Sequence, residues 1–310
     1  MKESERKKLL VIGSTVADII IELDRLPVTA EDVHVKSQAM SLGGCAHNVA
    51  DMIRHFDVPF TLFSPVGTGL YGDFVRRELE SKGMESPIPA PDMANGCCYC
   101  FVEASGERTF VVDHGAEYLF EKEWFDRLDL SEYGAAYICG LEIEERTGST
   151  IVDFLERSGL PVFFAPGPRL AKIDPALMDR IFALHPVLHL NREEICSYTG
   201  CPEVEDAAKA LFAQTKNSII ITQGADGACC LSPDGAFVHV PSFPVSHVTD
   251  TIGAGDGHCG AVMACLARGL SLRDALTAAN AVSAKIVSVK GALLSEEEFR
   301  EVYPIKPQNA

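Results

Sequence analysis

Positive charge is scarce in this sequence, which has 27 lysine and arginine residues against 44 aspartate and glutamate residues and a formal net charge of −17. Nucleic acids and anionic membrane surfaces are bound through basic faces, and a chain this acidic does not offer one. We therefore expect neither a nucleic acid nor a membrane as a partner. A nucleotide is still permitted, because backbone amides and a metal ion can hold its phosphates on an acidic protein.

Long hydrophobic runs are also missing, since no window approaches the roughly 18 apolar residues of a membrane-spanning helix. Residues 1–8 are charged and the apolar run after them breaks at Gly13, which argues against a secretory signal. The eleven cysteines are odd in number and scattered, and the pair Cys97 and Cys100 has no second pair at zinc spacing. We expect free thiols and a cytoplasmic protein.

Short apolar runs alternate with helical segments along most of the 310 residues. This alternation favours an α/β fold in which helices cover both faces of a parallel sheet. The charged ends, 1–7 and 306–310, have the composition of disordered segments. The candidate strands of the sheet are 8–12, 60–66, 135–139, 162–165, 187–190 and 219–222.

Two segments of alternating pattern, 97–103 and 108–113, are separated by a short polar loop and predict a hairpin. They interrupt the alternation of strands and helices, so we expect a small sheet laid over the main one. Extended segments at 19–23 and 33–40 would complete it, giving a lid formed by about 14–42 and 96–116. A lid of this kind excludes water from a transfer reaction.

The stretch 250–260 reads DTIGAGDGHCG and leads into an apolar helical segment. Glycines let a backbone approach a ligand closely, and a helix N-terminus directs free N–H groups at an anion. Asp256 is an ionisable side chain placed in this anion site. It suits a base that removes a proton from a nucleophile while the amides hold a transferring phosphoryl group. The alternative is a turn in which Asp256 only caps the helix.

A second glycine turn, Gly43-Gly44, opens a helix that carries Asn48 and no nearby lysine or arginine. Such a turn suits hydroxyl groups better than a phosphate. Asp18 lies between apolar stretches, where a carboxylate either reaches solvent at a strand end or faces a polar ligand. The pattern G-x-G-x-x-G occurs at 67–72 and at 255–260, and two matches in one chain show how weak the pattern is. A dinucleotide site needs the pattern near the first strand and an acidic strand end about 20 residues later, whereas the match at 67–72 leads to Glu85-Ser86-Pro87, so a dehydrogenase is a remote alternative.

Further polar residues follow the predicted strands, where the ligands of open α/β sheets bind. Glu142 follows one strand, and Asn191 and Glu194 follow another. Thr222, with the glycines after it, follows a third. Taken alone, Asn191 and Glu194 have the spacing of a helix cap and its capping-box partner.

Asp250-Thr251-x-Gly253-Ala254-Gly255-Asp256 resembles the C-terminal signature of the ribokinase (PfkB-type) carbohydrate kinases. The resemblance extends over nearly the whole chain. It implies a single kinase domain, 1–310, with a ribokinase-like three-layer α/β/α fold, a mostly parallel central sheet and a small β-sheet lid. The other matching motifs, in family order, are Gly13-Ser14 with Asp18, Gly43-Gly44-x-x-x-Asn48, Gly67 with Gly72, Gly106-Glu107-Arg108-Thr109-Phe110, Asn191-x-x-Glu194, Thr222-x-Gly224-x-x-Gly227 and Asn280.

The resemblance implies ATP-dependent phosphorylation of a hydroxyl group, with Asp256 as the base and the amides of Gly253, Ala254, Gly255 and Asp256 as the anion hole. It further implies Mg2+ bound through water at Glu194 and allows K+ or another monovalent cation beside Asp250, as well as a homodimer through the lid. The expected substrate residues are Asp18, Gly43, Gly44, Asn48, Glu142 and Asp256. The expected ATP residues are Asn191, Thr222, Gly224, Gly227, Thr251, Gly255 and Asn280.

Departures from the family pattern bear on the substrate. Cys45 stands where ribokinases carry lysine, and Val16 where they carry asparagine, so two donors to a sugar are lost and ribose itself is disfavoured. Asp51 near the substrate turn disfavours a phosphorylated substrate. His47 replaces a small residue next to Asn48 and is expected to fill or read part of the pocket. We expect a neutral sugar or sugar-like alcohol; the alternatives are a nucleoside kinase of the adenosine or pseudouridine type, or a non-catalytic sensor, against which the intact Asp256 argues.

Overall fold

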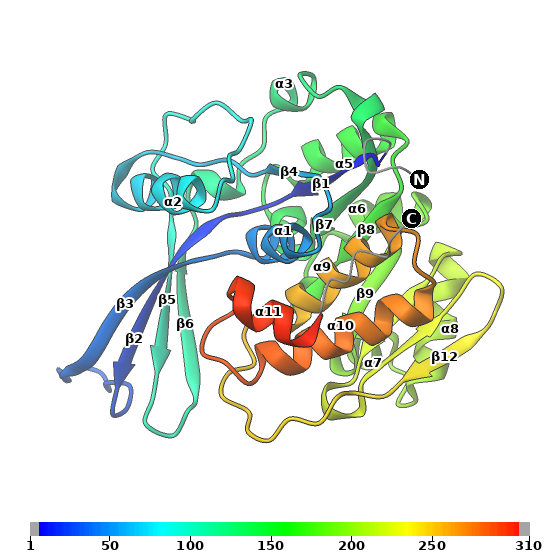
Figure 1. The fold of residues 1–310 in the computed structure, drawn as a ribbon. Helices are drawn as coiled ribbons and strands as arrows, with labels where there is room; N and C mark the ends of the chain where they lie inside the picture. Colours follow the sequence, from blue (N-terminus) through cyan, green and yellow to red (C-terminus); the bar gives the residue numbers. More distant parts are fainter. Residues whose placement is uncertain (1–5, 304–310) are drawn as a thin grey trace.

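The structure, a computed structural model, describes residues 6–303 (Figure 1). The predicted disordered ends, 1–7 and 306–310, lie for the most part outside these residues. The chain builds a central sheet of eight strands in the order β12-β11-β10-β9-β8-β7-β1-β4. These strands are β1 (Lys8–Ile12), β4 (Phe60–Phe63), β7 (Tyr133–Cys139), β8 (Val162–Ala165), β9 (Val187–Asn191), β10 (Ile219–Thr222), β11 (Ala228–Leu231) and β12 (Phe237–Val240).

The central sheet is parallel from β4 to β10 and becomes antiparallel only at β11 and β12. Three strands, β1, β8 and β10, begin and end at the predicted residues, 8–12, 162–165 and 219–222. The strand predicted at 60–66 ends three residues early, at Phe63. The α/β class and the mostly parallel sheet are therefore confirmed.

Helices cover both faces of this sheet because alternate side chains of a strand point to opposite faces. On β1, Leu9 and Val11 pack with α1, α9 and α10, whereas Leu10 and Ile12 pack with α5, α6 and α8 on the other face. The three-layer arrangement is thus confirmed. The helices are α1 (Cys45–His55), α2 (Gly69–Ser81), α3 (Lys122–Phe125), α4 (Gly140–Glu144), α5 (Gly148–Ser158), α6 (Pro175–Ala183), α7 (Arg192–Thr199), α8 (Val204–Thr215), α9 (Ala254–Ala267), α10 (Leu272–Ile286) and α11 (Glu296–Val302).

A separate four-stranded sheet projects from one side of the molecule (Figure 1). Its order is β3-β2-β5-β6, with β2 (Val16–Leu23), β3 (Val35–Gly43), β5 (Cys97–Val102) and β6 (Arg108–Asp113). The hairpin and the two early strands do join as expected. The strand expected at 19–23 begins earlier, at Val16, so Asp18 lies inside β2 and not before it.

Among residues 6–303, no helix has the length and apolar character needed to cross a membrane. All eleven cysteines lie in this part of the chain, and each is a free thiol.

Candidate active site

The stretch 250–260 forms a turn that opens α9, and Gly253 is its N-cap residue with a φ of 73°. A Cβ atom at Gly253 would lie 2.4 Å from Cβ of Ala292, so both the backbone conformation and the space require glycine. The first N–H groups of a helix have no partner within it, and no side chain caps this one. Since the N–H of Ala254 turns back to the carbonyl of Thr251, the amides of Gly255 and Asp256 are the donors best placed for an anion.

Asp256 does not cap its helix; its carboxylate instead faces α1. Nδ2 of Asn48 donates a hydrogen bond of 2.8 Å to Oδ2 of Asp256. Burial raises the pKa of Asp256 to about 6, with the charge of Glu142 acting in the same direction and the bond from Asn48 against it. The carboxylate is therefore more basic than a free aspartate but still ionised at neutral pH, as a general base should be.

Asp18 approaches the second glycine turn so closely that a side chain at Gly43 would displace its carboxylate. A Cβ atom at Gly43 would lie 2.0 Å from Oδ2 of Asp18, and one at Gly44, where φ is 96°, would lie 2.5 Å from the carbonyl of Ser14. The two strands bring these residues together, because Asp18 pairs with Ser41 and Gly43 is its diagonal neighbour. Burial raises the pKa of Asp18 to about 7. Hydrogen bonds from the hydroxyl groups of a bound ligand would stabilise the ionised carboxylate.

A cavity of about 520 Å³, here called the Asp256 cavity, gathers most of the predicted substrate residues. Its wall also includes side chains that the sequence analysis did not place there. The predicted residues in the wall are Asp18, Gly44, Asn48, Asn191, Glu194, Thr222, Gly253, Gly255 and Asp256. Val16 and Cys45, the two departures expected at the sugar site, are in the wall as well. The additional residues include Cys98, Phe110, Val112, His114, Tyr118, Tyr137, Arg169 and His189.

Two residues that the sequence analysis assigned to the pocket, Glu142 and His47, are not part of the cavity wall. Glu142 is buried, and its carboxylate accepts bonds of 2.7 Å from the N–H of Ser14 and from the thiol of Cys139. It thereby fixes the turn before β2, and a direct substrate contact remains a prediction. His47 is fully buried and does not belong to the cavity wall, so the expectation that it fills the pocket is wrong. It lies on the face of α1 that packs inward.

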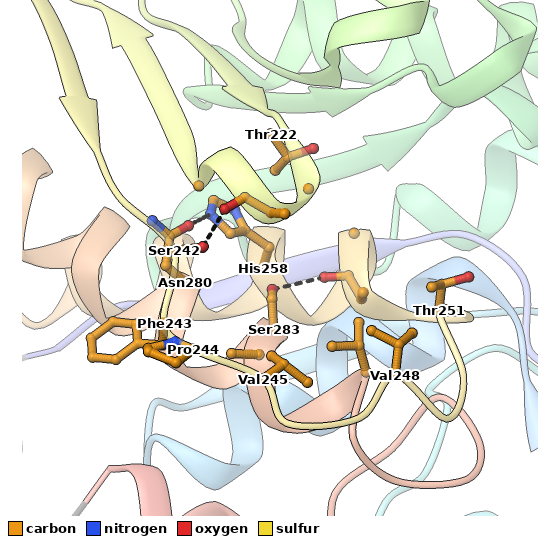
Figure 2. A pocket seen from close by; sticks show the side chains of 17 residues that line it. Thr222, Ser242, Phe243, Pro244, Val245, Val248, Thr251, His258, Asn280 and Ser283 are labelled. Atoms are coloured by element: carbon orange, nitrogen blue, oxygen red, sulfur yellow. Dashed lines mark hydrogen bonds between the residues drawn. The ribbon is translucent and has the colours of Figure 1, made fainter.

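A second cavity, of about 500 Å³, adjoins the first and is here called the Phe243 cavity (Figure 2). Thr222 and Gly255 belong to both walls. The predicted ATP residues in its wall are Thr222, Gly224, Gly227, Thr251, Gly255 and Asn280. One side is formed by apolar residues with no counterpart in the prediction, namely Phe243, Pro244, Val245, Val248, Ala284 and Val287. A flat apolar wall of this kind suits an aromatic ring.

Asn191 and Glu194 form the capping box at the start of α7. Oδ1 of Asn191 accepts from the N–H of Glu194 at 2.8 Å, and Oε2 of Glu194 accepts from the N–H of Asn191 at 2.9 Å. This part of the prediction is confirmed. Burial raises the pKa of Glu194, and the capping box uses only one of its two oxygens. A carboxylate at the cavity wall is the donor type that holds Mg2+ or its water, so the residue fits that role.

Asp250 lies just before the turn and is paired with the small sheet. Its Oδ2 is 2.8 Å from Nη2 of Arg108 on β6, and it also accepts from the N–H groups of Ile252 and Gly291. Burial acts to raise the pKa of Asp250, but these partners outweigh it and lower the pKa. Because Arg108 already neutralises the carboxylate, the arrangement does not favour a monovalent cation there, which remains a prediction only.

The apolar residues in the walls of the two cavities could not be predicted from the polar motifs, which indicate only the polar residues of the site. One signal was present: the segment 241–248 contains Phe243 and Val248, two large apolar side chains that stay exposed in a loop without helix or strand. Exposed apolar side chains close together in a loop are typical of a binding surface. The residues that β6 and β7 contribute to the wall of the Asp256 cavity could not be predicted in this way. Their position depends on how the two sheets pack together, and no local sequence pattern indicates that packing.

The chain is similar to known proteins over nearly its whole length. Residues 6–298 match the family described as pfkB family carbohydrate kinase. A protein of Escherichia coli (strain K12) described as the uncharacterized sugar kinase YegV is 33% identical over 291 residues, covering 92% of this chain and 90% of that protein. Among solved structures, ribokinase from Thermotoga maritima superposes with a TM-score of 0.82 at 22% identity, covering 96% and 100% of the two chains.

Ribokinase from Arabidopsis thaliana, solved in complex with ribose and ATP, has a TM-score of 0.79 at 18% identity, covering 97% of this chain and all of that one. At this level of identity the two structures establish the ribokinase-like fold alone. The family match covers nearly the whole chain and the sugar kinase relative is similar over the same length. The chain therefore belongs to the pfkB family of carbohydrate kinases.

Proposed function

We propose that this protein is an ATP-dependent kinase that phosphorylates a hydroxyl group of a neutral sugar or sugar-like alcohol, with Asp256 as the general base. One observation carries the proposal: a carboxylate with a raised pKa stands beside free helix amides where two cavities meet. Phosphoryl transfer needs a base for the acceptor hydroxyl, hydrogen-bond donors for the transferred group and a separate space for each of the two reactants.

In this mechanism the sugar occupies the Asp256 cavity and ATP the Phe243 cavity. Asp18 and Asn48 hold the sugar hydroxyls, and Asp256 takes the proton of the hydroxyl that attacks the γ-phosphorus. A bond from that oxygen to phosphorus forms as the bond to the leaving ADP oxygen breaks. The amides of Gly255 and Asp256 hold the charge that develops on the phosphoryl oxygens. Mg2+, when bound with ATP, neutralises phosphate charge, and Glu194 is placed to hold its water.

The charges of the cavity wall favour a neutral acceptor. Its arginine, Arg169, lies 3.0 Å from Glu144, and its histidine His114 is in contact with Glu145. These two groups therefore already have a carboxylate partner, and burial lowers the pKa of the third, His189, which keeps that imidazole neutral. A substrate phosphate would have to displace one of these partners while approaching Asp18 and Asp256.

A nucleoside is the second candidate acceptor, because part of the Asp256 cavity is apolar. Phe110 and Val112 of β6 are exposed at the surface and line the cavity together with Val16. A nucleobase could pack against this apolar side while its ribose reaches Asp18 and Asn48. A sugar offers only the C–H face of its ring to these side chains and gains less from burying them than a nucleobase does.

The first experiment measures ADP release with Mg-ATP and a panel of pentoses, hexoses, sugar alcohols, sugar acids and nucleosides. Replacing Asp256 by asparagine should lower turnover by roughly 10² to 10⁴, the usual effect of losing a general base. Binding of ATP, measured by calorimetry, should be nearly unchanged. Asp206→Asn, which removes an exposed carboxylate on α8, serves as the matched control.

Either of two results would contradict the proposal. Turnover that survives in the Asp256→Asn variant would exclude this residue as the base. A wild-type protein that binds ATP and leaves the whole panel unchanged would instead favour a sensor that has kept the fold. Turnover confined to nucleosides would select the second candidate.

A further inference from the structure

A buried row of three polar side chains connects the two cavities. His189 on β9 belongs to the wall of the Asp256 cavity, and His258 on α9 and Asn280 on α10 belong to the wall of the Phe243 cavity (Figure 2). Nε2 of His189 is 2.9 Å from Nδ1 of His258, and Nε2 of His258 is 3.1 Å from Oδ1 of Asn280. The three residues are 6%, 2% and 5% exposed, so bulk water hardly competes with these bonds.

The hydrogen bonds of this row have a fixed direction. Nδ2 of Asn280 donates to the carbonyls of Val240 and Pro241, each at 3.0 Å, which turns its oxygen toward His258. An amide oxygen only accepts, so Nε2 of His258 carries the proton and its Nδ1 is an acceptor. Nε2 of His189 must then donate. Burial lowers the pKa of both imidazoles, which keeps them in the neutral forms that this pattern needs.

The end of the row holds one wall of the Phe243 cavity. Val240 is the last residue of β12, and the residues after it, 242–245, line the cavity without belonging to a helix or strand. The two bonds from Asn280 and one from the hydroxyl of Ser242 to the carbonyl of Ala225 tie the start of this segment to the body of the protein. Both polar atoms of the Asn280 side chain are thus used within the protein. Asn280 would therefore contribute to ATP binding indirectly, by holding this wall of the Phe243 cavity.

We propose that His258 is a positioning residue for the nucleotide: by orienting Asn280, it sets the place of the segment 240–245 and so the affinity for ATP. This inference rests on the proposed function, in which the Phe243 cavity takes ATP. A phenylalanine ring at position 258 would fill the space but could not orient the amide of Asn280.

The test compares His258→Phe with His258→Gln, which can still donate to Asn280. The phenylalanine variant should raise KM for Mg-ATP about tenfold, the usual effect of one lost buried hydrogen bond, while kcat and KM for the sugar change less than about twofold. The glutamine variant should return KM for Mg-ATP to within about threefold of wild type. His55→Phe is the matched control, because His55 is also buried and bonded, to the carbonyl of Leu294, but lies outside both cavities.

Hydrogen exchange gives a readout that does not depend on activity. Without nucleotide, the amides of Ser242, Phe243 and Val245 should exchange faster in His258→Phe than in wild type or in His55→Phe. Equal exchange rates, or an equal rise of KM in the His55→Phe control, would overturn the inference. A wild-type protein that does not bind Mg-ATP would overturn the proposed function, whereas the exchange rates would still test whether His258 holds the wall.

A second variant covers the case in which His258→Phe does not fold. Asn280→Asp keeps an acceptor for His258 but loses both donors to Val240 and Pro241. Exchange in the segment 242–245 should then rise although the bond to His258 remains. If exchange there stays at the wild-type rate, the row does not hold this wall and the inference is wrong.

Discussion

At the residue scale, two glycines of the same turn meet different demands. Gly253 has a φ of 73° and leaves no room for a Cβ atom beside Ala292. Gly255 has no atom within 4 Å of the place where its Cβ would be, and it lines both cavities. The first glycine is therefore required by the fold. The second is required, if our proposal holds, by the space through which the phosphoryl group passes.

This difference predicts opposite behaviour of two alanine variants. Gly253→Ala should lower the free energy of unfolding by at least about 1–3 kcal/mol, because alanine is strained at positive φ and its methyl group also meets Ala292. Gly255→Ala should be as stable as wild type or up to about 1 kcal/mol more stable, since alanine favours the helix. Its kcat should nevertheless fall about tenfold or more, because the methyl group displaces the reactants.

Urea denaturation and steady-state kinetics on the same preparations check both halves. Two variants that lose stability to the same extent would contradict the account of the turn. A Gly255→Ala enzyme with unchanged kcat would mean that the transferred group does not pass Gly255.

The site residues could be predicted from the sequence as far as their motifs are local. Asp256, Gly253 and the capping box of Asn191 and Glu194 follow from patterns within a few residues, and the structure gives them the expected local geometry. The partners of Glu142 and Asp250 could not be predicted. Ser14 is 128 positions away from Glu142, and Arg108 lies on the small sheet whereas Asp250 lies in the loop before α9, so only the assembled fold brings each pair together.

At the scale of elements, the small sheet is tied to the body of the protein by two ion pairs of unequal burial. Arg108 on β6 contacts Asp250 at 2.8 Å, with side chains 25% and 4% exposed. Glu22 on β2 contacts Lys290 at 2.7 Å, with side chains 36% and 72% exposed. Exposed pairs contribute little to stability, whereas a buried carboxylate that loses its partner costs much more. The first pair should therefore decide how firmly β6 closes the Asp256 cavity.

We accordingly expect Arg108→Gln to loosen the small sheet as a lid. KM for the sugar should rise about tenfold, because Phe110 and Val112 of β6 line the cavity, and ATP hydrolysis without sugar should increase as water gains access. Lys290→Gln breaks the exposed pair between the same two parts and should change each quantity by less than about twofold. Steady-state kinetics with and without sugar would measure these effects. Equal results for the two variants would argue against a lid held by Arg108.

The elements themselves were largely predictable, because apolar runs of four to seven residues mark the buried strands. Boundaries were less so. β2 begins at Val16, whereas the prediction began it at residue 19. The start was missed because Asp18 interrupts the apolar pattern, although the residue pairs with β3 in the sheet. Here a residue that lines the Asp256 cavity disturbs the pattern that would mark the element.

At the scale of the whole molecule, a dimer through the small sheet remains a prediction. Several large apolar side chains of this sheet are exposed, among them Val35 on β3 and Phe110, Val111 and Val112 on β6. Burying such a group against a second copy would be favourable. Phe110 and Val112 also line the Asp256 cavity, so a dimer and a substrate would compete for part of the same surface.

The whole molecule also buries two groups of ionisable side chains that respond to acid in opposite ways. His47, His189 and His258 have pKa values lowered by burial, to about 4 for His47 and His258. The unfolded chain therefore takes up more protons at these sites, and the stability they allow is lost as the pH falls from 6.5 toward 4. Burial raises the pKa of Asp18 to about 7 and that of Asp256 to about 6. The folded protein holds protons there that the unfolded chain releases, so these two residues contribute stability as the pH falls toward 4.

Removing one of the carboxylates should therefore make the protein more sensitive to acid. Between pH 7 and pH 5, Asp256→Asn should lose about 1 kcal/mol more of its free energy of unfolding than wild type loses, because a pKa raised from 3.8 to about 6 contributes this much over that interval. Urea denaturation at pH 7, 6 and 5 measures the difference, with Asp206→Asn as the exposed control, which should follow wild type. If Asp256→Asn also runs parallel to wild type, the pKa of Asp256 is not raised in the folded protein. The carboxylate would then lack the added basicity that suits it to take a proton from the acceptor.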